Sequence, residues 1–122
     1  ERLRPWFDHE RLGLSTTLEQ DEPSRSDCHA WGAHPVHHFH ATLLGIRPAA
    51  PGFVRVRVAP QLGPLAWAQG VCVHPRGEIT ARFERSRERL QGFVTLPPGV
   101  TGQFHDGAAQ QELIPGRNVI GA

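Results

Sequence analysis

The chain is organised around one stretch, SRSDCHAWGAHP (residues 24–35), and around the helix expected to continue from it to Leu44. Within five residues this stretch places a carboxylate, a thiol, an imidazole and an indole, at Asp27, Cys28, His29 and Trp31. Apolar residues then recur at helical spacing, so residues 27–44 are expected to be helical. Pro35 should start a new helix or kink this one, because its ring removes a backbone donor.

The segment before this stretch is expected to hold a short helix and a polar loop. Residues 1–14 carry apolar side chains at a loosely helical spacing, with Pro5 suited to a first turn and Gly13 to the end. Residues 15–24 are polar and contain three carboxylates, Glu19, Asp21 and Glu22. An acidic run of this kind is typical of a solvated loop.

After the helix the pattern changes to that of β-structure. Residues 53–59 alternate strictly between valine and arginine, which predicts a half-buried strand. Further short strands separated by Pro and Gly turns are expected at residues 65–73, 78–84, 90–96, 101–105, 111–113 and 118–120. The predicted fold is therefore mainly β, an antiparallel β-sandwich preceded by a short helical segment. A linker is expected at Pro48, Pro51 and Gly52, so the expected domains are residues 1–47 and 48–122.

Composition excludes several classes of function. The 122 residues suffice for one modest domain, and the formal net charge of +1 gives no reason to expect nucleic acid or an acidic membrane as partner. No apolar run reaches membrane-spanning length. There is no Met in the chain, so we expect it to be a piece of a longer protein.

Two groups of side chains are candidates for a metal site or a catalytic pair. The histidines at positions 34, 37, 38 and 40 include pairs at helical spacing that could chelate a metal, but no Cys or carboxylate joins them, and no physiological metal site is expected. Cys28 and His29 are adjacent, so on a helix they point about 100° apart and do not form a nucleophile and base pair. Cys28 and Cys72 either pair or stay as two buried thiols, and a small buried apolar role is expected for Cys28.

The linked motifs from residue 26 to residue 68 resemble the carboxyl-terminal end of bacterial α-L-rhamnosidases. These motifs are SDCHAW (26–31), LLGIRP (43–48), PGF (51–53), APQLG (59–63) and LAWA (65–68). The resemblance covers nearly the whole chain and weakens into generic strands after Leu90. It implies that residues 1–47 are the end of an (α/α)6 toroid and that a β-sandwich follows directly.

The resemblance also implies a function. Enzymes of this family release terminal rhamnose from glycosides by inverting hydrolysis, without a cofactor, using a general acid and a carboxylate base roughly 6.5–9.5 Å apart. The base lies in a Thr-Thr-containing segment, here residues 15–19, which gives Glu19 that position and leaves Glu22 as a second candidate. His29 matches the histidine lining the sugar subsite, and Trp31 would form an apolar wall against the sugar. The general acid lies outside this chain, so the fragment alone is expected to be inactive.

Other functions stay open for the sandwich. A carbohydrate-binding module would need exposed aromatic side chains aligned on one sheet face, and the candidates are Trp67, Phe83 and Phe93. A purely structural sandwich that supports the toroid would need no exposed aromatic side chains, and this interpretation is preferred for residues 53–122 taken alone. The apolar side of the helix over residues 27–44 further predicts a homo-oligomer.

Overall fold

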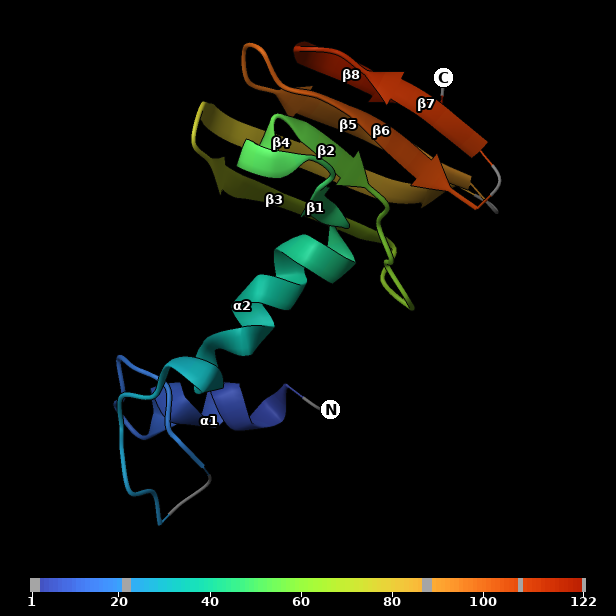
Figure 1. The fold of residues 1–122 in the computed structure, drawn as a ribbon. Coiled ribbons are helices and arrows are strands. Elements are labelled where there is room, and N and C mark those ends of the chain that lie inside the picture. The colour runs from blue at the N-terminus through green and yellow to red at the C-terminus, as the bar shows by residue number, and fades with distance from the viewer. Residues whose placement is uncertain (1–2, 21–22, 87–88, 108, 122) are drawn as a thin grey trace. The chain divides into compact units, whose positions relative to one another are not determined.

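The computed structural model describes residues 3–20, 23–86, 89–107 and 109–121 (Figure 1). The chain divides into two compact units, Glu1–His38 and Phe39–Ala122, and each is described by itself. No helix among the described residues is both long and apolar enough to cross a membrane.

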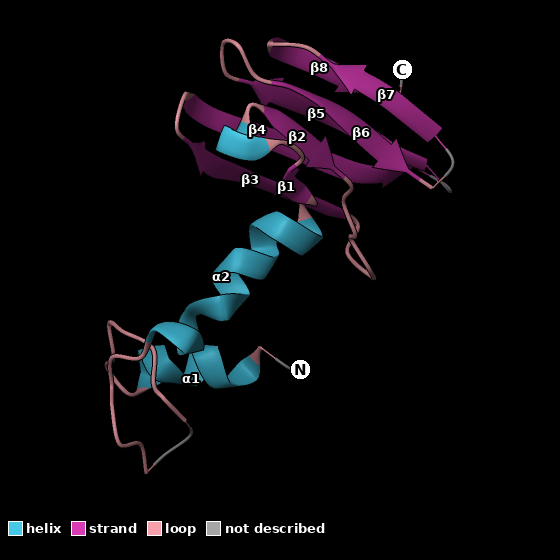
Figure 2. Cartoon of the chain, in the orientation of Figure 1, coloured by secondary structure: helices cyan, strands magenta, loops and turns pink. Residues whose placement is uncertain are grey.

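The first unit begins with the predicted short helix. Helix α1 (Arg4–Arg11) has Pro5 in its first turn, where the missing backbone donor costs nothing, and Gly13 follows it with a φ of 72°. After a long loop come the 3₁₀ helix η1 (Ala30–Ala33) and helix α2 (His34–His38). Figure 2 shows how much of this unit is loop rather than helix.

The prediction of one helix over residues 27–44 is wrong in its start and in its regularity. Helical structure begins at Ala30 and passes from 3₁₀ (η1) through α (α2) to a π-helix, η2 (Phe39–Leu43), at the beginning of the second unit. Residues before Ala30 are extended because their backbone groups are used elsewhere. The His29 backbone N–H donates to the Thr17 carbonyl oxygen (2.8 Å), and the Glu19 N–H donates to the Ser26 oxygen (2.9 Å). Gly45 ends η2 as predicted, with a φ of 70°.

The second unit is the predicted β-sandwich, with two four-stranded sheets of strand order β1-β2-β6-β7 and β3-β4-β5-β8 (Figure 1). The strands are β1 (Ile46–Pro48), β2 (Arg55–Val58), β3 (Trp67–His74), β4 (Gly77–Ser86), β5 (Arg89–Leu96), β6 (Thr101–Asp106), β7 (Ala109–Leu113) and β8 (Gly116–Ile120). A 3₁₀ turn, η3 (Pro51–Phe53), lies between β1 and β2. All the predicted strands are present, with bounds shifted by a few residues.

Alternation of apolar and polar side chains explains which faces meet. In β2, Val56 and Val58 are fully buried, while Arg55 and Arg57, which alternate with them, are exposed. In β4, Ile79, Ala81 and Phe83 point inward, and the Phe83 ring stacks on Phe104 of the other sheet with centroids 5.7 Å apart. The inner faces of both sheets therefore share one apolar core.

Two features of the sandwich were not predicted. Residues 46–48, where the linker was expected to start, form β1 and pair antiparallel with β2. Strands β2 and β6 pair in parallel, so the sandwich is not purely antiparallel. The β2–β6 pairing joins segments far apart in the chain, since parallel neighbours need a long crossover connection. The β1–β2 pairing is local, but β1 is only three residues long and ends at Pro48, so it shows no clear alternation.

The two cysteines are both free thiols. Cys72 is half-buried, but Cys28 is exposed, so the expectation of a buried apolar role for Cys28 is wrong. Cys28 lies before the first helical residue, Ala30, in a loop that exposes its side chain. Gly70 pairs in register with Ala81 and lies under the Leu44 side chain.

Candidate functional site

The segment around Glu19 is fixed by backbone contacts with the stretch that precedes η1. Thr17 pairs with His29 through two hydrogen bonds, one from its side-chain hydroxyl (2.7 Å) and one at its carbonyl oxygen (2.8 Å). Gly32 lies directly against this segment, because a Cβ there would be 2.6 Å from the Leu18 carbonyl oxygen. The small residue after Trp31 thus permits the loop carrying Glu19 to approach η1.

Glu19 is held at its backbone and at its carboxylate. The Trp31 indole N–H donates to the Glu19 carbonyl oxygen at 3.0 Å, and the Arg25 guanidinium forms an ion pair with the Glu19 carboxylate. The Glu19 side chain is only 7% exposed, whereas that of Arg25 is 77% exposed. A carboxylate so enclosed has a fixed orientation, which a base acting on one water molecule requires.

Glu19 and Trp31 line one concave site in the first unit. Its volume is about 480 Å³, and its wall also includes Trp6, His9 and His34. Trp6 and His34 meet edge to face with ring centroids 5.2 Å apart. Among the described residues that line this site, Glu19 is the only carboxylate. The site can therefore supply a base and apolar surfaces, but not the second carboxyl group that acid-base hydrolysis needs.

His29 is beside this cavity but does not line it. Its ring packs on Trp31 with centroids 4.2 Å apart and planes inclined by 37°. Its Nδ1 atom is buried and has no hydrogen-bond partner in the described part of the chain. Buried polar atoms are normally paired, so this nitrogen lacks a contact that a ligand or another segment would provide.

Of the sequence-based candidates, the structure brings Glu19, His29 and Trp31 together. Glu22, the second candidate for the base, lies outside the described residues. The sequence reasoning missed Trp6 and His9, although their spacing of three on α1 puts them on one helix face. His34 was noted only as a possible metal ligand, and its Nδ1 instead lies 3.0 Å from the Trp31 carbonyl oxygen.

No metal centre emerges from the histidine cluster. Among the described residues, no three His, Cys, Asp or Glu side chains gather closely enough to hold an ion. The rings of His34 and His38 are 6.0 Å apart and inclined edge to face. His40 makes a contact of its own, with Nε2 lying 2.9 Å from the Val71 carbonyl oxygen.

Of the three aromatic side chains considered for carbohydrate binding on the sandwich, Trp67 and Phe93 lie on the outer face of one sheet and Phe83 lies in the core. Phe83 is fully buried in the core, whereas Trp67 is 55% exposed on the outer side of the second sheet. Guanidinium groups lie over the two outer rings: that of Arg82 is 5.2 Å from the Trp67 centroid, and that of Arg117 is 3.8 Å from the Phe93 centroid. Each outer ring therefore has a guanidinium group over one of its faces.

Comparison with known proteins identifies a family that matches the second unit. The family described as the bacterial alpha-L-rhamnosidase C-terminal domain matches residues 45–118, more than half of the chain. A curated relative, the alpha-L-rhamnosidase of Alteromonas sp. (strain LOR), is 30% identical over 67 residues, which are 54% of this chain and 7% of that protein.

Solved structures with the same fold are also alpha-L-rhamnosidases. That from Streptomyces avermitilis, complexed with L-rhamnose, gives a TM-score of 0.72 at 20% identity, covering 96% of this chain and 15% of its own. Those from Dictyoglumus thermophilum and Aspergillus terreus give TM-scores of 0.67 and 0.66 at 18% and 16% identity. They cover 86% and 93% of this chain, and 13% and 15% of their own lengths. The chain therefore spans a small part of each of these relatives.

Proposed function

Because the chain belongs to the family of bacterial alpha-L-rhamnosidase C-terminal domains, we propose that it is the carboxyl-terminal portion of a glycoside hydrolase that releases terminal rhamnose by inverting hydrolysis. In this proposal, residues 1–47 are the end of a helical catalytic toroid and residues 48–122 are the sandwich that supports it. The observation that carries the catalytic part is the enclosed Glu19 carboxylate in a concave site walled by two indoles.

Glu19 is the proposed general base. It would take a proton from the water molecule that attacks the anomeric carbon, while a general acid outside this chain protonates the leaving oxygen. The ion pair with Arg25 fixes the direction of the carboxylate, and the hydrogen bond from Trp31 fixes its backbone. One carboxylate cannot serve as both acid and base in an inverting displacement, so the 122-residue chain alone should not hydrolyse an aryl α-L-rhamnoside.

Trp31 and His29 are proposed to bind the sugar. The indole of Trp31 is 61% exposed and offers an apolar surface to one face of the ring. His29 does not line the cavity, and its proposed contact with a glycoside hydroxyl lies at the edge of the site, beside Trp31, on which its ring packs. The partners of the intact enzyme are accordingly rhamnose-containing glycosides, bound without a cofactor.

Replacing Glu19 by Gln in the intact enzyme tests the proposal. General-base assistance contributes about 10²–10⁴-fold, on the order of 3–5 kcal/mol of barrier. We expect kcat and kcat/KM to fall together by such a factor, because the amide keeps the size and most contacts of Glu19 but cannot accept the proton.

The matched controls are Glu22→Gln and His29→Ala. Glu22→Gln should keep near-normal kcat, and His29→Ala should raise KM with a smaller loss of kcat, since a subsite contact acts on ground and transition states alike. If Glu22→Gln loses kcat while Glu19→Gln does not, Glu22 is the base. If neither change matters, the site is not catalytic.

A further inference from the structure

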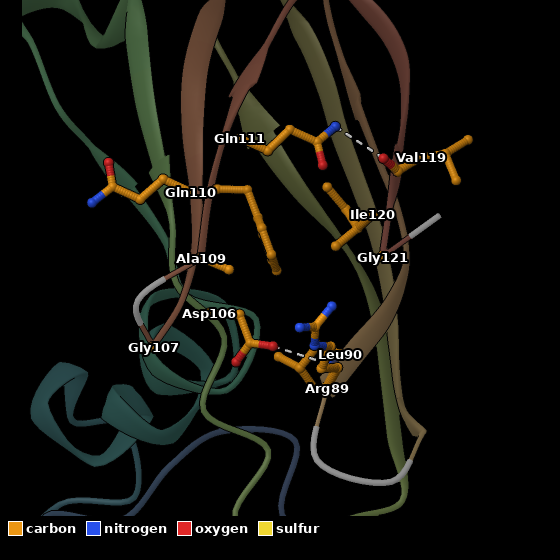
Figure 3. A pocket seen from close by; sticks show the side chains of 11 residues that line it. Arg89, Leu90, Asp106, Gly107, Ala109, Gln110, Gln111, Val119, Ile120 and Gly121 are labelled. Carbon is orange, nitrogen blue, oxygen red and sulfur yellow. Dashed lines mark hydrogen bonds between the residues drawn. The ribbon is translucent and has the colours of Figure 1, made fainter.

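A second cavity opens at one edge of the sandwich, where the edge strands of the two sheets, β7 and β8, face each other (Figure 3). Its volume is about 670 Å³, within the range typical of small-molecule sites. The ends of β5 and β6 close it on the other side. All of its lining residues belong to the second unit, far in sequence from Glu19.

Hydrogen bonds between the two sheets hold the walls of this cavity in place. The Leu90 backbone N–H of β5 donates to Oδ2 of Asp106 in β6 at 3.0 Å. The Gln111 side-chain amide of β7 donates to the Val119 carbonyl oxygen of β8 at 2.9 Å. Both polar side chains are therefore oriented before any ligand binds, which lowers the entropic cost of binding.

The same contacts leave hydrogen-bonding groups available to a ligand. Asp106 uses one carboxylate oxygen for Leu90, and Gln111 uses its NH₂ group for Val119, so the second carboxylate oxygen and the amide oxygen remain acceptors. Arg89 is exposed, and its guanidinium, which has no ion pair or hydrogen bond within the described part of the chain, is turned into the cavity (Figure 3). Phe104 and Ile120, both nearly fully buried, form the apolar floor.

The charged side chains of the cavity, Arg89 and Asp106, favour some classes of ligand over others. An anion attracted by Arg89 would meet the carboxylate of Asp106, and a cation attracted by Asp106 would meet the guanidinium. A peptide strand added along β8 would need the Val119 carbonyl oxygen, which already accepts a hydrogen bond from the Gln111 side chain. A neutral molecule with neighbouring hydroxyl groups can instead accept hydrogen bonds from Arg89 and donate to Asp106 and Gln111 at once.

We infer that this edge cavity is a binding site for a neutral saccharide. The inference goes beyond the proposed catalytic role and does not depend on Glu19, because the two sites share no residue. It gives the sandwich a ligand in addition to its supporting role, at a place other than its aromatic face. The cavity is open to solvent and has no bare aromatic ring, so the affinity should be weak, with a Kd on the order of 1 mM.

Titration of the isotope-labelled 122-residue chain, followed by amide NMR shifts, tests this inference. L-rhamnose and D-glucose, two neutral sugars, should shift the backbone amides of Gly107, Ala109 and Gly121 as they fill the cavity. Inorganic phosphate and methylammonium, as charged probes, should leave them unchanged. The inference is wrong if neither sugar moves these amides at about 50 mM, if phosphate moves them as strongly, or if the shifts gather around Trp67.

Substitutions in the cavity sharpen the test. Arg89→Gln should weaken sugar binding by roughly tenfold, because it removes a charged two-pronged donor. Asp106→Asn keeps an acceptor for the Leu90 N–H, so the fold should persist, but it removes the negative charge and should create a response to phosphate. Arg57→Gln, an exposed arginine of β2 outside the cavity, is the matched control and should change nothing. Sugar binding that survives both cavity substitutions would overturn the assignment.

Discussion

The unit Glu1–His38 and the unit Phe39–Ala122 are stabilised by different kinds of interaction. In the first, Leu18 and Pro35 are the only buried residues among those described, and the loop around Glu19 is held mainly by hydrogen bonds and stacked rings. In the second, apolar side chains from both sheets form one continuous core. Apolar burial is the dominant favourable term in folding, so the second unit contains most of the stability of the chain.

The two units therefore differ in their proposed roles, catalysis for the first and structural support for the second. The side chains proposed to act on a glycoside lie on loops and short helical turns, where residues can be placed by hydrogen bonds without a packed core. The sandwich offers rigid faces and a preformed edge cavity instead. Regions with few buried contacts open more readily than a packed core, so the proposed catalytic segment should be the less stable part of this chain.

The largest expected effect follows from removing core packing. Phe83→Ala should destabilise the sandwich by about 3–5 kcal/mol, because it removes a fully buried ring stacked on Phe104. Phe7→Ala, the matched change in the first unit, removes a ring that is 69% exposed and should cost less than about 0.5 kcal/mol. Denaturant unfolding measures both. Equal losses for the two variants would show that the units do not differ in the way described.

A smaller effect concerns self-association. Helix α2 of the first unit exposes Val36 at 57%, and we propose that this apolar surface pairs two copies of the chain. Val36→Ser should then weaken the association measured by light scattering roughly tenfold, about 1.4 kcal/mol. Val73→Ser, at an equally apolar and more exposed position of the sandwich, is the control and should have little effect. A wild-type chain that stays monomeric at high concentration contradicts the proposal.

The smallest effect lies in the reactivity of the two thiols, one in each unit. Burial raises the pKa of the Cys72 thiol, so less of it is thiolate at a given pH than in an unperturbed cysteine. Cys28 is exposed. A disulfide reagent at about pH 8 should therefore modify Cys28 several-fold faster than Cys72, and the gap should narrow as the pH rises. Faster modification of Cys72 would show that its strand opens more easily than the loop around Cys28.

The fold of the sandwich could be predicted from sequence because its signals are local. Alternation such as Ile79, Ala81 and Phe83 identifies a strand and its buried face within seven residues. The parallel contact of β2 with β6 was missed because pairing between distant segments gives no such signal. Strand β1 was missed because it is only three residues long and ends at Pro48.

Only part of the candidate site could be predicted from the sequence, for the same reason. The resemblance to rhamnosidases singled out Glu19, His29 and Trp31, but the wall formed by Trp6, His9 and His34 arises from contacts across more than 20 residues. The helix expected from residue 27 failed because propensity and spacing do not report the competing pairing of residues 26–29 with the segment that holds Glu19. A local sequence pattern does not show which acceptor a backbone N–H will form its hydrogen bond with.

The central claim, that Glu19 activates the attacking water, is tested most directly by chemical rescue of Glu19→Ala in the intact enzyme. Removing the side chain opens room for azide, a small anion that attacks the anomeric carbon without a base. We expect azide to restore part of the lost rate in this variant and to have no such effect on the wild-type enzyme. The product should be a rhamnosyl azide of inverted configuration. A Glu19→Ala variant that loses little activity, or that azide leaves inactive while Glu22→Ala is rescued, would contradict the account.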